Sequence, residues 1–122
     1  MKQHIDLEQL RTIAQKNDYD TFAEFYRLIR NDKNTSYNGI KRFYDRLRNG
    51  ETLGFDKLLS EINIGKLIEI LNNKTNIIFI ECVENRDGKD YWSVEASVNE
   101  SSRFQLIDAL YSDVCQILGV NY

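Results

Sequence analysis

The side chains of this chain that are best placed to do chemistry are the basic ones between residues 27 and 48. Seven lysines and arginines lie there against two aspartates, Asp32 and Asp45. The seven are Arg27, Arg30, Lys33, Lys41, Arg42, Arg46 and Arg48. Positive charge concentrated in this way favours a surface that binds a polyanion or, together with an acidic remainder, a dipolar surface that binds a protein.

The second half of the chain carries the opposite charge. Residues 1–60 hold 11 Lys and Arg against 9 Asp and Glu, whereas residues 61–122 hold 5 against 10. The formal net charge is −3 and the pI is near 5.2, which is more acidic than is usual for a protein that binds duplex DNA. The acidic side chains that could form a second binding surface are Glu81, Glu84, Asp87, Asp90, Glu95 and Glu100.

The residue types that commonly carry catalysis are few. The chain has one histidine, His4, and two cysteines, Cys82 and Cys115, with no spacing typical of a zinc site or of a nucleophile pair. Its glycines are isolated, so they do not form a phosphate-binding loop. We therefore predict a binding protein rather than an enzyme, with no metal and no cofactor. Both thiols lie in apolar contexts and are predicted to be buried.

Five short helices are predicted over residues 6–72. Apolar residues recur at helical spacing, and the breaks between them fall at polar residues and glycine because the chain has no proline. Capping boxes are predicted to open the first two helices, at residues 6–9 and 21–24. The third helix is predicted to begin near Thr35 or Ser36 and to end at residues 49–50, with the fourth over 55–62 and the fifth after Asn63.

The hydrophobic period then changes from helical to alternating. Residues 77–80 and 91–98 are predicted to form a hairpin around an Asp-Gly turn. Trp92 is predicted to be substantially buried and to face the last helix together with Val94, Ala96, Phe104 and Ile107. A third capping box at residues 102–105 is predicted to open that helix, which ends at Gly119. We therefore predict an α+β fold with two units. Residues 1–73 form a five-helix, helix-turn-helix-like bundle, and residues 74–122 form a β-hairpin plus helix.

Several short segments of the helical part resemble the Cro/repressor-type helix-turn-helix domain of phage and mobile-element proteins. Residues 44–50 resemble the end of its recognition helix, residues 55–59 and 64–67 the helices that follow, and Phe22-Ala23 its first motif helix. Two features depart from the family pattern. The family has its second apolar residue about ten positions after the alanine, whereas Tyr44 lies twenty-one residues after Ala23. The family usually has a turn glycine four residues after the alanine, and Arg27 occupies that position here.

That resemblance implies a DNA-binding surface on the third helix. Its groove-facing positions would be Lys41, Arg42, Asp45 and Arg46, where basic side chains could reach guanine or phosphate. The resemblance also implies a phosphate site at the helix start, formed by Thr35 and Ser36. We add Tyr37 and Arg48 to the residues expected to bind nucleic acid. The side chains predicted to be exposed, and to form the main positive surface, are Lys41, Arg42, Arg46 and Arg48.

Two hypotheses of different classes follow. In the first, the chain is a phage-type regulator that binds duplex DNA through the third helix, and the C-terminal unit is a dimerisation or effector module. In the second, it inhibits a nucleic-acid-handling host protein, such as a defence nuclease, in the manner of anti-CRISPR proteins. An acidic surface would then occupy the basic nucleic-acid channel of that host protein. Its residues would be Glu81, Glu84, Asp87, Asp90 and Glu95. An immunity protein or antitoxin is a third possibility, since it would bind its target through the same charge complementarity.

The expected location is the cytoplasm. No apolar run approaches the roughly 18 residues of a membrane span, so no membrane partner is expected. The first four residues lead into a polar helix without the apolar core of a signal peptide.

Overall fold

The computed structural model describes residues 2–30, 36–74, 78–84, 90–96, 99–103 and 105–122. Six helices and three strands lie in these ranges. They are α1 (Leu7–Lys16), α2 (Tyr19–Arg30), α3 (Tyr37–Arg48), α4 (Asp56–Glu61), α5 (Ile64–Lys74), β1 (Ile78–Glu84), β2 (Asp90–Ala96), β3 (Asn99–Arg103) and α6 (Leu106–Leu118). The predicted α+β class is confirmed. No described helix is both long and apolar enough to cross a membrane.

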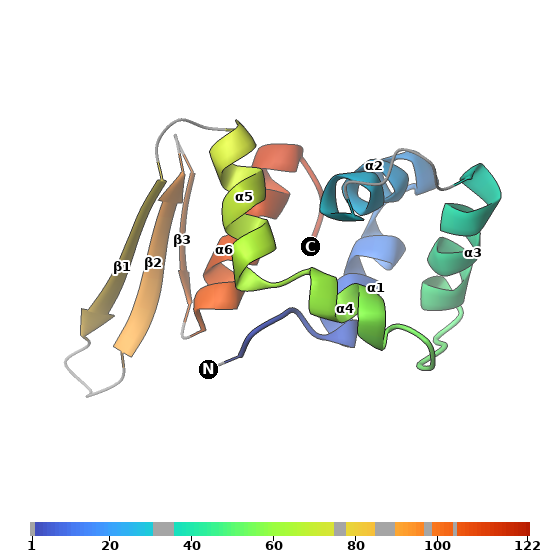
Figure 1. Ribbon diagram of the computed structural model, residues 1–122, viewed down its shortest axis with the longest axis horizontal. Helices are drawn as coiled ribbons and strands as arrows, with labels where there is room; N and C mark the ends of the chain where they lie inside the picture. The colour runs from blue at the N-terminus through green and yellow to red at the C-terminus, as the bar shows by residue number, and fades with distance from the viewer. Residues whose placement is uncertain (1, 31–35, 75–77, 85–89, 97–98, 104) are drawn as a thin grey trace.

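The elements are spread along the long axis of the molecule, in an order that differs from their order in the sequence (Figure 1). The sheet is at one end, α5 and α6 stand beside it, α1, α2 and α4 follow, and α3 lies at the other end. The basic helix and the acidic strands are therefore at opposite ends of the molecule.

Capping residues fix most of the helix boundaries. Asp6 forms the predicted capping box with Gln9 at the start of α1, and the Ser36 side chain accepts a hydrogen bond from the Gly39 N–H at the start of α3. The predicted start of α2 at Thr21 is wrong. The Asp18 carboxylate accepts from the Thr21 N–H at 2.8 Å, so the helix begins at Tyr19, three residues before Phe22, the first residue after the predicted cap. This hydrogen bond lowers the pKa of Asp18.

The sheet has one strand more than predicted. Strands β1, β2 and β3 pair antiparallel in that order, and Val94 of the central strand lies opposite Ile80 and Ser101. The predicted capping box at residues 102–105 is wrong because residues 102 and 103 belong to β3, and α6 starts at Leu106. Pairing of their backbone with β2 outweighs a local cap of about 1 kcal/mol.

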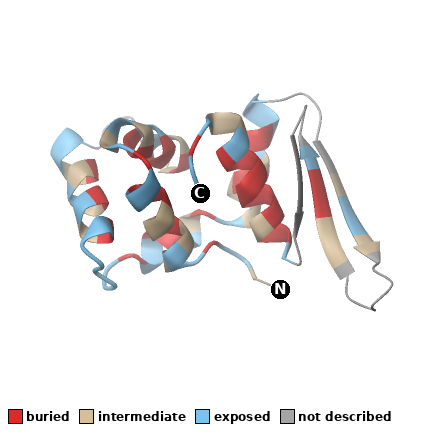
Figure 2. Cartoon of the chain, turned by 180° about the vertical axis from the view of Figure 1, so that it is seen from behind, coloured by how far each residue is buried: buried red, intermediate tan, exposed pale blue. Residues whose placement is uncertain are grey.

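A single core runs through the helical part and the strand-containing part, as the buried residues in Figure 2 show. α5 packs against α6, and α6 packs against β2 and β3. Trp92 is half-buried and packs against the core, while Val94 and Ile107 are completely buried. Of the other residues predicted to pack with Trp92, Phe104 and the side chain of Ala96 lie outside the described residues. The division at residue 73 stays a prediction.

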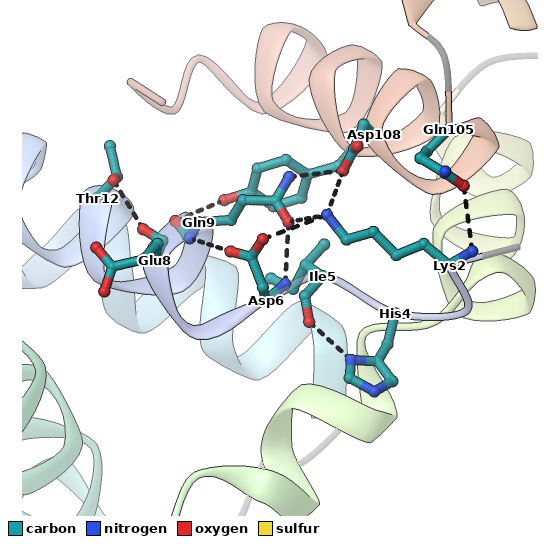
Figure 3. Close-up of polar contacts among 10 residues, drawn as sticks. Lys2, His4, Ile5, Asp6, Glu8, Gln9, Thr12, Gln105 and Asp108 are labelled. Carbon is teal, nitrogen blue, oxygen red and sulfur yellow. Dashed lines mark hydrogen bonds and ion pairs between the residues drawn. The ribbon is translucent and has the colours of Figure 1, made fainter. Parts of the chain in front are cut away.

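A polar network ties the N-terminal segment to α6 (Figure 3). The Lys2 ammonium lies 2.8 Å from the Asp108 carboxylate and donates to the Gln9 side-chain oxygen at 3.0 Å, and the Gln9 amide donates to the same carboxylate at 2.8 Å. The Lys2 backbone N–H also donates to Gln105 at 3.1 Å. These groups satisfy one another where the two ends of the sequence meet.

The two cysteines differ in burial, which corrects the prediction that both thiols are buried. Cys82 on β1 is exposed, whereas Cys115 on α6 is buried. Burial raises the pKa of Cys115 to about 12, so its thiol stays protonated and unreactive at neutral pH.

Thiol labelling is expected to separate the two cysteines. At pH 8 a maleimide should modify one thiol of the folded protein rapidly, and Cys82→Ser should abolish that fast phase while Cys115→Ser leaves it unchanged. Cys115 should react only after denaturation. Fast labelling of both thiols in the native protein would contradict the burial of Cys115.

Candidate nucleic-acid interface

One stripe of α3 faces solvent along the whole helix. Asn38, Arg42, Asp45 and Asn49, the C-cap residue just after the helix, are exposed, and they recur at intervals of three or four residues, so they share one face. The opposite face holds the buried side chains of Ile40, Tyr44 and Leu47. This strong amphipathicity and the place of α3 at the end of the molecule leave the stripe accessible to a large ligand (Figure 1).

Arg42 is the free cation of this stripe. It is exposed, and within the described part of the chain it has no hydrogen-bond or ion-pair partner. An arginine in this state presents its full fork of N–H donors, which suits a phosphate or the edge of guanine.

Lys41 and Arg46 are only partly exposed, which corrects the prediction that all four basic residues are open to solvent. The Lys41 ammonium donates to Asp45 at 3.0 Å and lies 5.0 Å from the centre of the Tyr44 ring. The hydrogen bond to Asp45 raises the pKa of Lys41. The Arg46 guanidinium lies 4.7 Å from the centre of the Phe55 ring and donates to the Leu53 carbonyl.

The role of Arg46 is therefore structural: it joins α3 to the segment before α4. Its Nε also lies 3.3 Å from the Glu51 carboxylate, and a Cβ at Gly54 would lie 3.2 Å from its guanidinium. The close approach and the positive φ of 85° both favour glycine at position 54. Arg46 is thus unavailable to a ligand without breaking these contacts.

Arg48, the last residue of α3, is exposed but is also held by hydrogen bonds. Its Nη1 donates to the Tyr44 hydroxyl at 2.6 Å, and that hydroxyl donates to the Asn17 carbonyl at 2.9 Å. This chain of hydrogen bonds fixes α3 against the junction of α1 and α2 while the Arg48 guanidinium remains at the surface.

The start of α3 presents an aromatic side chain. Tyr37 is 58% exposed, and its ring centre lies 4.6 Å from that of Tyr19 on α2. The Ser36 hydroxyl accepts from the Gly39 N–H at 3.2 Å, so its own proton is left for a ligand. Thr35, the other residue expected at a phosphate site, lies outside the described residues, as do Asp32 and Lys33.

A groove of about 470 Å³ borders Tyr37 on the α2 side. Arg27 and Lys74 contribute positive charge to its lining, and Asp20 and Glu24 contribute negative charge. Because the two signs balance among these four residues, the groove does not have the excess of positive charge that would favour an anion.

No protein-family model, curated protein or solved structure matches this chain. The resemblance to the helix-turn-helix family thus stays an expectation from the sequence. Six residues separate α2 from α3, compared with the 3–4 of the usual motif turn, and five of them lie outside the described residues.

The second predicted surface is described only in part. Glu81 on β1 and Glu95 on β2 are exposed, and the strand register places them on the same face of the sheet. Asp87 and the side chains of Glu84, Asp90 and Glu100 lie outside the described residues. The two described carboxylates lie at the end of the molecule opposite α3, so they do not offset the positive charge of Arg42 (Figure 1).

Asn38 and Asn49 are the stripe residues that the sequence prediction missed. Both lie at helical spacing from Arg42, four residues before it and seven after it, so periodicity alone would have found them. The prediction followed charge and therefore passed over two uncharged side chains. Asparagine can form paired hydrogen bonds with adenine, just as arginine can with guanine.

Proposed function

We propose that this chain is a non-enzymatic nucleic-acid-binding protein, a regulator of phage or mobile-element type, that binds duplex DNA through the exposed stripe of α3. The observation that carries this proposal is the composition of the stripe. It consists of Asn38, Arg42, Asp45 and Asn49. These are side chains that donate to or accept from base edges, and an α-helix fits the major groove.

The surroundings of the stripe support the same function. Arg48 at one end and Ser36 at the other are surface groups that could donate to phosphates and position the helix. The exposed Tyr37 could lie against a sugar or a base beside the helix start. The hydrogen bonds of Arg46 and Arg48 hold α3 rigidly, which reduces the entropy lost on binding.

The stripe holds a single cation, Arg42, which predicts a shallow dependence of the affinity on salt. Each phosphate neutralised contributes about −0.9 to the slope of log K against log salt on duplex DNA, so a protein with one or two such contacts is far less salt-sensitive than a strongly basic one. The acidic net charge of the chain agrees with this expectation, because most of the affinity would then come from base contacts.

The test is duplex binding by wild type and Arg42→Glu at two salt concentrations. Wild type is expected to bind a randomised duplex pool at low salt, and Arg42→Glu to bind at least about tenfold more weakly. Lys57→Glu is the matched control, since Lys57 is exposed on α4 and the charge change is the same. Both variants should melt near the wild-type temperature because exposed charges contribute little to stability.

The proposal is wrong if wild type does not bind duplex at low salt, or if Lys57→Glu weakens binding as much as Arg42→Glu does. In either case the exposed Glu81 and Glu95 become the better candidate, and binding to a basic, nucleic-acid-handling protein is the function to examine.

A further inference from the structure

A pocket of about 350 Å³ lies where α1, α6 and the segment after α6 meet. It adjoins the polar network of Figure 3 and shares no residue with the α3 stripe. Its volume is near the lower end of the range for small-molecule sites, roughly 300–1,000 Å³, so it suits a ligand of the size of a sugar ring or a nucleoside. The residues that line it are Gln9, Thr12, Asp108, Tyr111, Ser112 and Tyr122.

The Asp108 carboxylate is held at this pocket with only one of its two oxygens in use. Its Oδ1 accepts from the Lys2 ammonium at 2.8 Å and from the Gln9 amide at 2.8 Å (Figure 3). Gln9 is fixed in turn, because its side-chain oxygen accepts from the Asp6 backbone N–H at 2.9 Å. Within the described residues Oδ2 of Asp108 has no hydrogen-bond or ion-pair partner. The side chain is only 26% exposed, so this oxygen offers its lone pairs at a fixed position.

The charges around the pocket favour a neutral ligand. Asp108 is the only charged residue among the described residues that line the pocket, and the Lys2 ammonium offsets its charge. Lys2 also lies 3.4 Å from the Asp6 carboxylate. A cation would have to compete with Lys2 for Asp108, and an anion would be repelled by the two carboxylates. A neutral molecule that donates hydrogen bonds meets neither cost.

Two tyrosine rings give the pocket an apolar wall. The ring centres of Tyr111 and Tyr122 lie 6.5 Å apart, edge to face. The Tyr122 hydroxyl is held by Ser112 at 2.8 Å and by the Gln116 amide at 3.0 Å, so the ring keeps its place although Tyr122 is 41% exposed. An apolar wall beside a fixed acceptor matches a sugar ring, which has C–H faces and carries hydroxyls on its rim.

We propose that this pocket binds the vicinal diol of a sugar ring, either in a free sugar or in the ribose of a nucleoside. The two hydroxyls donate to Oδ2 of Asp108, and the ring lies against Tyr122. Thr12 provides a further acceptor, because its own hydroxyl proton goes to the Glu8 carbonyl at 2.8 Å. Carboxylates hold ribose hydroxyls in the same way in dinucleotide-binding folds. The proposal does not rest on the proposed DNA binding.

The test uses the full chain and two ligands that differ only in the diol. Methyl ribofuranoside carries the diol, and its 2-deoxy analogue lacks one of the two hydroxyls. Backbone amide NMR shifts during titration report where each ligand binds and how tightly. Methyl ribofuranoside is expected to shift the amides of residues 9–12 and 108–112. The deoxy analogue should bind at least about tenfold more weakly, because it loses a hydrogen bond to a charged group.

Asp108→Asn tests the carboxylate itself. The amide oxygen of asparagine can still accept from Lys2 and Gln9, while its NH₂ group replaces Oδ2 and donates instead of accepting. The variant should therefore keep its fold and bind the riboside at least about tenfold more weakly. Asp20→Asn is the matched control, since Asp20 is exposed on α2, outside the pocket, and should leave binding unchanged. If Asp108→Asn does not fold, the two ligands on wild type still decide the question.

Adenosine identifies the source of the diol. Tighter binding of adenosine than of methyl ribofuranoside would assign the pocket to a nucleoside, and equal or weaker binding would assign it to a sugar. The proposal is overturned if neither ligand shifts the amides that line the pocket, if the deoxy analogue binds as well as the riboside, or if Asp108→Asn binds it as wild type does. A protein that binds the diol but no duplex would refute only the proposed function, and the reverse result would refute only the diol site.

Discussion

Phe55→Ala is expected to lower the free energy of unfolding by about 3–5 kcal/mol, the range for truncating a large aromatic side chain in a core. Phe55 is completely buried. Its ring centre lies 6.2 Å from that of Phe43 and 4.7 Å from the Arg46 guanidinium. The truncation therefore leaves a cavity and also removes the surface on which Arg46 is held. Chemical denaturation followed by circular dichroism measures the effect.

Leu53 provides a matched control two residues away. Its side chain is 80% exposed, so Leu53→Ala removes a comparable apolar group with little change in burial. The expected loss is below about 0.5 kcal/mol. Similar losses for the two variants would show that the segment joining α3 to α4 does not pack as the structure describes.

The helix ends were predictable where the decisive interaction is local. The Asp6 capping box and the Ser36 cap each join residues three apart, so the sequence contains the whole interaction. The start of α2 was missed because Asp18 and Thr21 are both acceptable caps, three residues apart, and only the structure shows which one is used. Gly119 ends α6 with a positive φ of 69°, as its position in the sequence predicted.

Strand β3 was not predictable because it is stabilised by a distant partner. Its five residues have neither the β-branched content nor the alternation of a strand. They become a strand because β2 presents a second edge of backbone donors and acceptors on the side away from β1. The burial of Cys82 was predicted wrongly for a related reason. Alternation along a strand shows which face of the sheet a residue is on, but not how far α6 extends over that face.

The candidate site could be predicted only in part, because some of its side chains are held by partners whose positions depend on the tertiary fold. Helical spacing placed Arg42 and Arg48 at the surface correctly. It could not show that Arg46 binds Glu51 and packs on Phe55, because those partners belong to a segment whose path depends on the tertiary fold. Charge counted along a sequence therefore overstates the charge available to a ligand.

Arg42→Lys should separate base recognition from simple attraction to phosphate, because it keeps the charge and removes the planar fork. If Arg42 reads a guanine edge, the variant should lose about 1–3 kcal/mol of affinity for a duplex selected from a random pool. Its affinity for non-specific duplex should stay close to that of wild type.

Asn38→Ala extends the same test to an uncharged member of the stripe. It should relax sequence preference at one position of the selected site, with no change in the slope of affinity against salt, because asparagine neutralises no phosphate. Fluorescence anisotropy on the selected duplex and on single-base variants of it measures both quantities. If Arg42→Lys binds the selected and the non-specific duplex as wild type does, Arg42 contacts only phosphate. If Asn38→Ala also leaves the preference unchanged, the stripe does not read base sequence, and any binding by α3 is electrostatic alone.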